Sequence, residues 1–232
     1  SATEIAYIAQ KNHHRLYAHW RFNEQNGTGE TKDYSPSGTV GTTTSNTGTL
    51  VNLDVNNCRV EGMSGGNGIM FTPPGYVNLG ANAELNSTNY TVCAWIKPST
   101  IGGGYRIMGK CNTIAPYGFL MQLYTGNRLY AYQSVGGNFY AVALYTPWTL
   151  DTNFHHVAMT FAYDGTTSTL KLYVDGILKG TASAVGAPDL PPASETLKCG
   201  NGFDGIIDEV KLFTRTLNSD EVKKEFLNTG MW

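Results

Sequence analysis

The sequence has few charged residues and no long apolar run. Charged residues make up 15% of the 232 residues, against about 25% in typical soluble domains. The formal net charge is −2, so no basic surface of the kind that binds nucleic acid or an anionic membrane is indicated. No apolar segment approaches the roughly 20 residues that cross a bilayer. We therefore expect neither nucleic-acid binding nor membrane insertion.

The sequence also lacks the close cysteine pairs of a zinc site. Its four cysteines stand far apart and at irregular intervals, at Cys58, Cys93, Cys111 and Cys199. Zinc sites use closely spaced pairs of ligands, so this spacing argues against one. Cys93 lies inside a predicted strand, where a buried free thiol is expected. A disulfide between some pair of the four remains an alternative, and it would imply an oxidising compartment.

No signal peptide precedes the first predicted strand, and the chain starts at Ser1 without methionine. We interpret it as a mature or excised fragment of a larger multidomain protein. Residues 1–15 are expected to be an N-terminal extension or linker. Residues 16–232 are expected to form one domain, since β-sandwiches often reach this length.

The strongest structural signal runs from Asn153 to Thr181. Phe154 to Tyr163 reads as a strand with two half-buried faces, and Leu170 to Asp175 alternates apolar and polar residues. The dipeptide Asp175-Gly176 suits a tight hairpin turn that leads into a third strand at Ile177. This pattern predicts three consecutive antiparallel strands.

Further strands recur about every dozen residues with no helical segment between them, which indicates an all-β, two-sheet antiparallel β-sandwich. One short C-terminal helix is predicted after Leu217. Asn218 can cap it, Glu221 stands where a capping box requires a glutamate, and Leu217 can pack on Val222. Val222 and Phe226 share one face, and Gly230 ends the helix.

Several segments resemble laminin-G-like domains of the concanavalin A-like lectin/glucanase superfamily, in that family's order. They are Ala18, Trp20, Phe22, Glu24, Gly27-Thr28, Asp33, Ser35, Gly38, Gly68-Ile69-Met70-Phe71, Tyr76-Val77-Asn78-Leu79, Ala94-Trp95-Ile96-Lys97, Phe154-His155-His156-Val157-Ala158, Leu172-Tyr173-Val174-Asp175-Gly176 and Gly205 to Phe213. The resemblance spans roughly Tyr17 to Phe226. It implies a jelly roll in which the first and last strands pair. It does not specify function, because this fold carries lectins, adhesion modules, hydrolases and inert spacers.

The resemblance also suggests a structural calcium ion. If the N- and C-terminal strands pair, Glu24, Asp33 and Asp208 can converge, and oxygen ligands from neighbouring loops can complete the shell that calcium prefers. The alternative is that Asp208 accepts hydrogen bonds from loop amides while Glu24 pairs with a lysine or arginine.

Sugar binding is the leading functional hypothesis, because exposed aromatic rings can stack on pyranose faces. The predicted binding residues lie on loops or strand ends and are Tyr105, Arg106, Asn138, Tyr140 and Trp148. Tyr124, Tyr130 and Tyr132 are further candidates, although tyrosines are also ordinary sheet residues.

Enzymatic activity is not expected. Glycosidases of this fold carry a Glu-x-Asp-x-x-Glu strand, which this sequence lacks, and the adjacent Asp208 and Glu209 should point to opposite faces of a strand. The Gly62-Met63-Ser64-Gly65-Gly66 match to a nucleophile motif falls in a predicted loop rather than between a strand and a helix. We therefore expect a non-catalytic, extracellular or surface-located recognition module that binds a glycan. The alternatives are a protein-binding adhesion or structural module, or an accessory domain of a carbohydrate-active enzyme.

Overall fold

The computed structural model describes residues 16–35, 47–63, 65–81, 87–100, 105–111, 117–125, 128–192 and 194–227, with the backbone alone for 139–149. The predicted extension at 1–15 lies outside these ranges.

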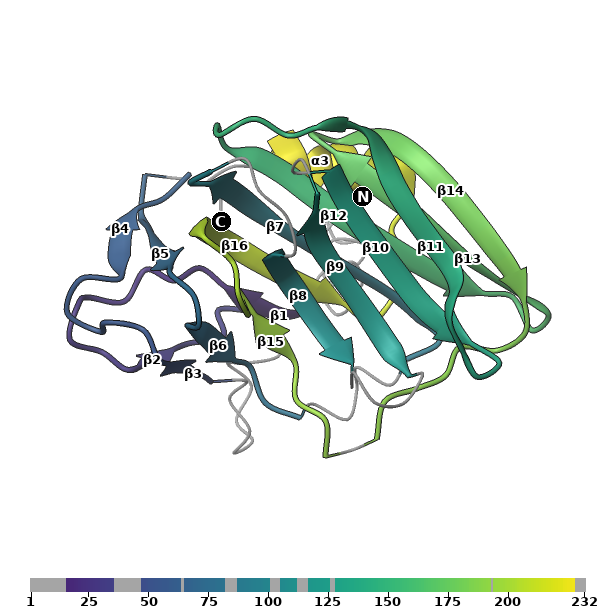
Figure 1. The fold of residues 1–232 in the computed structure, drawn as a ribbon, viewed down its shortest axis with the longest axis horizontal. Helices are drawn as coiled ribbons and strands as arrows, with labels where there is room; N and C mark the ends of the chain where they lie inside the picture. Colours follow the sequence, from purple (N-terminus) through teal and green to yellow (C-terminus); the bar gives the residue numbers. More distant parts are fainter. Residues whose placement is uncertain are drawn as a thin grey trace, which may run out of the picture.

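Two antiparallel sheets, each with eight described strands, lie face to face and confirm the predicted sandwich (Figure 1). Sheet A runs in the order β14 (Ile177–Val185), β13 (Thr167–Val174), β12 (His155–Tyr163), β7 (Asn89–Pro98), β16 (Gly205–Phe213), β5 (Asn67–Phe71) and β4 (Arg59–Glu61), and β1 (Leu16–Trp20) also pairs with β16. Sheet B runs in the order β11 (Asn138–Thr149), β10 (Arg128–Val135), β9 (Gly118–Tyr124), β8 (Tyr105–Cys111), β15 (Lys198–Cys199), β6 (Tyr76–Asn78), β3 (Gly48–Val51) and β2 (Glu30–Thr31).

Alternating apolar residues of both sheets fill the space between them, as the period of a strand requires. Their buried side chains include Val92, Ala94, Ile96, Val157, Met159 and Phe161 of sheet A, and Phe119, Met121, Leu123, Leu129 and Ala131 of sheet B. Each large apolar side chain buried in this way contributes about 1.5–3 kcal/mol to folding.

The first and last strands of the sandwich pair in sheet A. β1 is antiparallel to β16, and Trp20 lies opposite Val210. Trp20 is fully buried. Phe22 follows with a φ of 55°, which turns the chain out of the strand. The implied pairing of the chain's opening and closing strands is therefore confirmed.

The C-terminal helix α3 (Ser219–Leu227) covers the outer face of sheet A, and its predicted capping box is present. The Glu221 amide donates to Asn218 Oδ1 (3.0 Å), and the Asn218 amide donates to Glu221 Oε2 (2.9 Å). Leu217 and Val222 are both buried against Tyr173 in a second apolar cluster. This cover explains why β12, β7 and β16 are buried on both faces.

Two short strands in the first third of the chain have bounds that the sequence pattern does not predict. Strand β3 ends at Val51, since Asn52 has a φ of 54°. Arg59–Glu61 is a short strand that the glycine-rich surroundings concealed. No disulfide joins the four cysteines, all of which are described, and Cys93 is a buried free thiol as expected.

Candidate functional site

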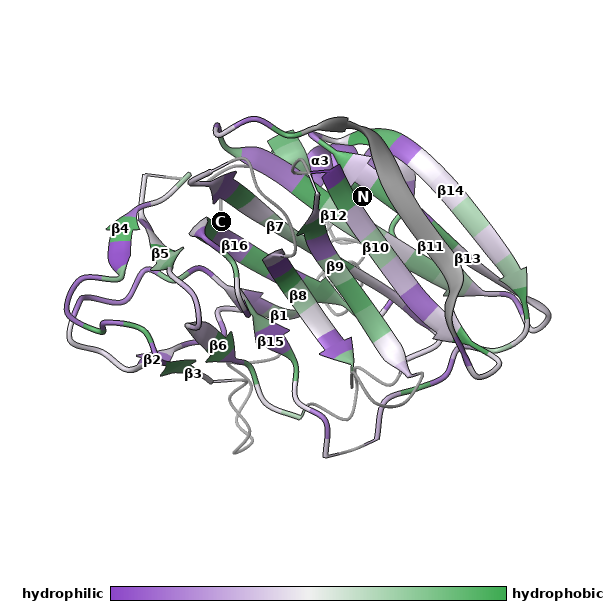
Figure 2. Ribbon diagram, in the orientation of Figure 1, coloured by the Kyte–Doolittle hydropathy of each residue, from purple (hydrophilic) through white to green (hydrophobic). Residues whose placement is uncertain are grey.

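The outer face of sheet B carries a cluster of aromatic and polar side chains on strands β8 to β10. Leu123 and Leu129 point into the core, so their neighbours Gln122, Tyr124, Arg128 and Tyr130 point outward. Figure 2 shows that both hydrophilic and hydrophobic residues occur along β8 and β10. We call this surface, formed by the outward positions of β8 to β10, the sheet B outer face.

Cross-strand register places these residues in rows. Arg106 of β8 lies opposite Gln122 of β9, and Gln122 lies opposite Tyr130 of β10. Tyr145 of β11 occupies the next backbone position in the same row. Directly opposed residues of antiparallel strands share a face and lie close enough to interact. One row therefore brings together a guanidinium, a carboxamide and a phenol.

Three tyrosines form a continuous ladder on the same face. The ring centroids of Tyr124 and Tyr130 are 6.0 Å apart, as are those of Tyr130 and Tyr132. Tyr130 and Tyr132 are buried together with Leu120, whereas Tyr124 is 41% exposed. The two inner tyrosines thus form an apolar floor, and Tyr124 is the ring that a ligand can reach.

The floor ends at Cys111. Burial raises the pKa of Tyr132, and the hydrogen bond with Cys111 adds to this effect. Burial likewise raises the pKa of the Cys111 thiol. Both groups are therefore neutral near pH 7, so this end of the face supports packing rather than nucleophilic chemistry.

The five predicted sugar-binding residues all lie in sheet B, but at opposite ends of it. Tyr105, Arg106 and Trp148 belong to the strand ends near the β9–β10 turn. Asn138 is exposed at the other end, beside the β10–β11 turn, and Tyr140 follows it in β11. They therefore do not form one site. Tyr105 lies opposite Leu123 on the core side, and its ring contacts Phe203 edge-on, with 6.4 Å between centroids.

Sequence reasoning missed Gln122 and Arg128 and gave no priority to Tyr124. Arg128 is exposed, lies opposite Tyr124, and donates from Nε to the Thr125 carbonyl (3.4 Å). The available signal was the alternation of β9 and β10, which puts these residues on the face of Tyr130. Only the register of the strands aligns that face with Arg106.

Glu24, the first predicted calcium ligand, accepts four hydrogen bonds or ion pairs. Its Oε2 contacts Arg59 Nη1 (3.0 Å) and the Thr31 hydroxyl (3.0 Å). Its Oε1 accepts bonds from the Lys32 amide (2.8 Å) and the Tyr34 hydroxyl (3.3 Å). Both side chains of the ion pair are buried, at 7% exposure for Glu24 and 1% for Arg59. This contact set matches the alternative in which Glu24 pairs with an arginine.

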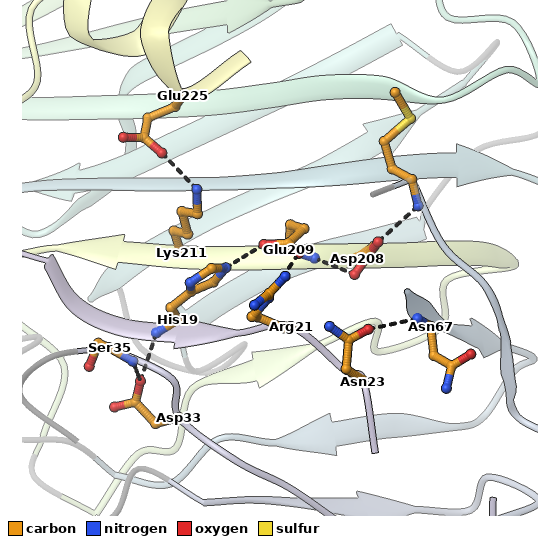
Figure 3. Close-up of polar contacts among 11 residues, drawn as sticks. His19, Arg21, Asn23, Asp33, Ser35, Asn67, Asp208, Glu209, Lys211 and Glu225 are labelled. Atoms are coloured by element: carbon orange, nitrogen blue, oxygen red, sulfur yellow. Dashed lines mark hydrogen bonds and ion pairs between the residues drawn. The ribbon is translucent and has the colours of Figure 1, made fainter. Parts of the chain in front are cut away.

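Asp33 and Asp208 accept backbone amides at separate places (Figure 3). Asp33 Oδ1 binds the amides of His19 and Ser35, both at 2.8 Å. Asp208 is fully buried; its Oδ2 accepts from the Met63 amide (2.9 Å) and its Oδ1 from the Glu209 amide (2.7 Å). In the described part of the chain, no three His, Cys, Asp or Glu side chains form a group that could hold a metal ion.

A β-bulge in β16 changes how Asp208 and Glu209 are displayed. Asp208 lies opposite Trp95 and Lys211 opposite Cys93, so β16 contains one extra residue here. Glu209 has a φ of 49°, and its carboxylate contacts His19 Nε2 and Arg21 Nε. Strand alternation predicted that the two acids point to opposite faces of the strand. That prediction is wrong, because the bulge interrupts the alternation and both side chains lie on the outer side of sheet A.

The bulge connects to a chain of charged groups on the outer side of sheet A. Lys211 Nζ contacts Glu225 Oε2 of α3 at 2.8 Å, close to the contact of Glu209 with His19 (Figure 3). Burial lowers the pKa of His19 although its bond to Glu209 acts in the opposite direction. The imidazole is thus a neutral donor near pH 7. These contacts fasten β1 and α3 to β16.

Asn23 shares the Asp208 neighbourhood and offers oxygen atoms to the same loop. Asn23 Oδ1 accepts from the Asn67 amide (2.7 Å). A Cβ atom at Gly66 would lie 2.0 Å from Asn23 Oδ1, and one at Gly62 would lie 2.4 Å from Asp208 Oδ2. Residues 62, 63, 66 and 67 therefore pack closely against these two side-chain oxygen groups.

The adjacent histidines of β12 occupy different environments. His155 Nδ1 contacts Asp175 Oδ2 (2.9 Å) and its Nε2 contacts Asp151 Oδ1 (3.0 Å). His156 is buried between Trp95 and Phe226 under α3, and none of the described residues hydrogen-bonds to its Nδ1. Burial lowers the pKa of His156 to about 3. Neither histidine lies on the sheet B outer face.

Known structures share this architecture. Domain 4 of the arabinanase AbnA from Geobacillus stearothermophilus, in complex with arabinotriose, aligns with a TM-score of 0.61 and 17% identity over 90% of this chain and 97% of that domain. The CBM40 of the Ruminococcus gnavus IT-sialidase, bound to α2,3-sialyllactose, aligns with a TM-score of 0.56 and 14% identity over 71% of this chain and 96% of that one.

The binding domain of botulinum neurotoxin DC, in complex with SialylT, aligns with a TM-score of 0.61 and 13% identity. That alignment covers 94% of this chain and 52% of the toxin domain. At these identities the likeness shows the fold alone. A comparison with curated protein sequences finds no match.

The family comparison rests on sequence. Residues 72–223, more than half of the chain, match the Laminin_G_3 family model. The matched residues include most strands of both sheets. Together with the jelly-roll topology, this match means that the chain belongs to the concanavalin A-like lectin/glucanases superfamily.

Proposed function

We propose that this chain is a non-catalytic carbohydrate-binding module whose sugar lies on the sheet B outer face beside Tyr124. The observation that carries the proposal is the tyrosine ladder, which holds one half-exposed ring over a buried floor. A fixed aromatic ring can cover the apolar face of a pyranose at little entropic cost. Arg128 beside the ring, and Gln122 and Arg106 in the next row, supply polar groups for the sugar hydroxyls.

The structural neighbours support glycans as the ligand class. One is domain 4 of an arabinanase in complex with arabinotriose, another is the CBM40 of a sialidase bound to α2,3-sialyllactose, and a third is a toxin binding domain in complex with SialylT. One is a domain of an extracellular arabinanase. By analogy, we propose an extracellular or surface location and a place within a larger multidomain protein. No helix in the described ranges has the length and apolarity needed to cross a membrane.

The absence of catalysis is part of the proposal. Most of the neighbours are binding domains, although a sialidase from Trypanosoma rangeli also aligns over part of its length. The acids that β16 displays, Asp208 and Glu209, accept amides or pair with cations on the outer side of sheet A. The described residues of the sheet B outer face offer phenol, amide and guanidinium groups, which bind sugars without cleaving them.

We further propose a structural calcium ion held by Asp208, Asn23 and carbonyls of residues 62, 63 and 65–67. The support is that Asp208 and Asn23 both present side-chain oxygens to this stretch, at the amides of Met63 and Asn67. Such an ion would stabilise the loop against β16 without taking part in sugar binding. Melting the protein with and without EDTA tests this: a lower Tm in EDTA is expected, and an unchanged Tm would contradict the proposal.

A glycan array with the full chain tests the main proposal. Wild type should bind at least one glycan class, and Tyr124→Ala should weaken binding roughly ten-fold or more through lost stacking. Tyr34→Ala is the matched control, because Tyr34 is 43% exposed and contacts Glu24, away from the sheet B outer face. If the protein binds no glycan on a broad array, that result would instead favour a protein-binding adhesion or structural module.

A further inference from the structure

Resting on the proposed glycan binding, we propose that the sheet B outer face selects anionic sugars, those that carry a carboxylate or sulfate group. The first observation is the distribution of acids. The chain has 18 aspartates and glutamates, yet none occurs from Leu85 to Leu150. This segment includes the whole of β7, β8, β9, β10 and β11. The strands that build the sheet B outer face therefore contribute no negative side chain to it.

The same segment contains four basic residues, and two of them lie on the sheet B outer face. Lys110 points into the core and donates from Nζ to the Ala81 carbonyl (2.5 Å). Lys97 stacks over Phe154, with Nζ 5.5 Å from the ring centroid. Arg106 and Arg128 point outward instead, the first half-exposed and the second exposed. The positive charge that these strands place on the sheet B outer face thus comes from these two arginines.

The two arginines flank the accessible tyrosine at a distance that suits a small glycan. Arg106 on β8 lies two strands away from Arg128 on β10. Arg106 is aligned with Tyr130, which is two residues along β10 from Arg128. With strands about 4.8 Å apart and about 3.4 Å of rise per residue, their Cα atoms are separated by roughly 12 Å. One or two sugar rings fit this span. A guanidinium binds a carboxylate or sulfate through two parallel hydrogen bonds, which a neutral sugar cannot reproduce.

Acidic residues from neighbouring segments are engaged at the margins of the sheet. Asp189 accepts from the Gly137 amide (2.8 Å) at the far turn, and Glu195 contacts Lys198 (3.8 Å) near the Cys111 end. Asp151 follows β11 at the Arg128 end, where its carboxylate binds the Asn153 amide (2.7 Å) and His155 (3.0 Å). Each of these carboxylates has its own partners away from the row of Arg106.

The test is calorimetric titration of the full chain with lactose, sialyllactose and sulfated lactose. At least one anionic probe should bind ten-fold or more tightly than lactose, and its affinity should fall as salt is added. Arg106→Gln and Arg128→Gln should each weaken the anionic probe roughly ten-fold and leave lactose unchanged. Lys171→Gln, on the outer face of sheet A, is the matched charge control and should change nothing. Preference for sialyllactose over sulfated lactose would identify carboxylate as the selected group, and the reverse would identify sulfate.

Two results would overturn the inference without touching the proposed function. One is equal affinity for lactose and both anionic probes, with binding still lost in Tyr124→Ala. The other is an anionic preference that survives the Arg106→Gln/Arg128→Gln double variant. Failure of every glycan on a broad array would instead overturn the proposed function itself. Circular dichroism of each variant establishes that the sandwich is folded, which exposed arginine substitutions should leave intact.

Discussion

Replacing Glu24 by glutamine separates a structural ion pair from a metal ligand. The variant keeps the shape of the side chain but removes the charge that faces Arg59 Nη1 at 3.0 Å. Arg59 cannot escape to solvent, since its side chain is 1% exposed and also donates to the carbonyls of Phe22 (3.0 Å) and Glu30 (2.9 Å). Glutamine would leave a buried guanidinium without a counter-charge from residue 24.

The expected cost follows from burial of the pair. Removing one partner of a buried ion pair destabilises a protein by about 3–5 kcal/mol. At about 2–4 °C per kcal/mol for a chain of this size, the Tm should fall by roughly 10 °C. Adding Arg59→Met should recover part of this loss, with a coupling of about 1–3 kcal/mol. The exposed Glu30→Gln is the matched control and should stay within about 0.5 kcal/mol of wild type.

The assay is calorimetric melting of each variant in excess calcium and in excess EDTA. Glu24→Gln should lose the same stability in both solutions, because the carboxylate acts on Arg59. A loss seen only with calcium, together with wild-type stability in EDTA, would refute it. Glu24 would then be a metal ligand, as the family resemblance implies.

Three further predictions concern stability and are measured by urea denaturation. Asn218→Ala should cost about 1 kcal/mol, because it removes the side-chain acceptor of the Glu221 amide; an unchanged midpoint would contradict the cap. His155→Gln should destabilise below pH 6.5 and progressively less as pH rises, since the bond to Asp175 raises the pKa of His155 and its stabilisation is lost above that pKa; a pH-independent loss would argue against it. His156→Leu should flatten the acid side of the stability profile by up to about 1.4 kcal/mol per pH unit. The reason is that burial lowers the pKa of His156 from 6.5 to about 3, so between these pH values only the unfolded chain takes up a proton at this residue. A variant that remains as sensitive to acid as wild type would refute this.

The fold was predictable because its strongest signals are local. Phe154 to Tyr163 alternates as a strand, and the structure places β12 at His155–Tyr163. Asn218 and Glu221 are three residues apart, the spacing of a capping box, and they bond as expected. Both patterns depend on residues close in sequence, where period and turn chemistry suffice.

The candidate site was predictable only in part because it depends on register and on backbone irregularity. Arg106 was anticipated, but its alignment with Gln122 and Tyr130 follows from two strand pairings that no single segment encodes. The bulge at Asp208 and Glu209 likewise arises from an extra residue opposite β7. One extra residue of this kind reverses which face the following side chains occupy, so the alternation of the sequence predicted the wrong face for one of the two acids.

The closure of the sandwich in sheet A has a consequence for how such a domain can be built into a longer chain. Leu16 lies directly opposite Phe213, so the first strand of the sandwich and the strand that leads to α3 lie side by side in sheet A. Segments that precede Leu16 and follow Phe213 therefore leave the sandwich from neighbouring strands of sheet A. The arginines and tyrosines of the sheet B outer face lie in the opposite sheet from this pair of strands.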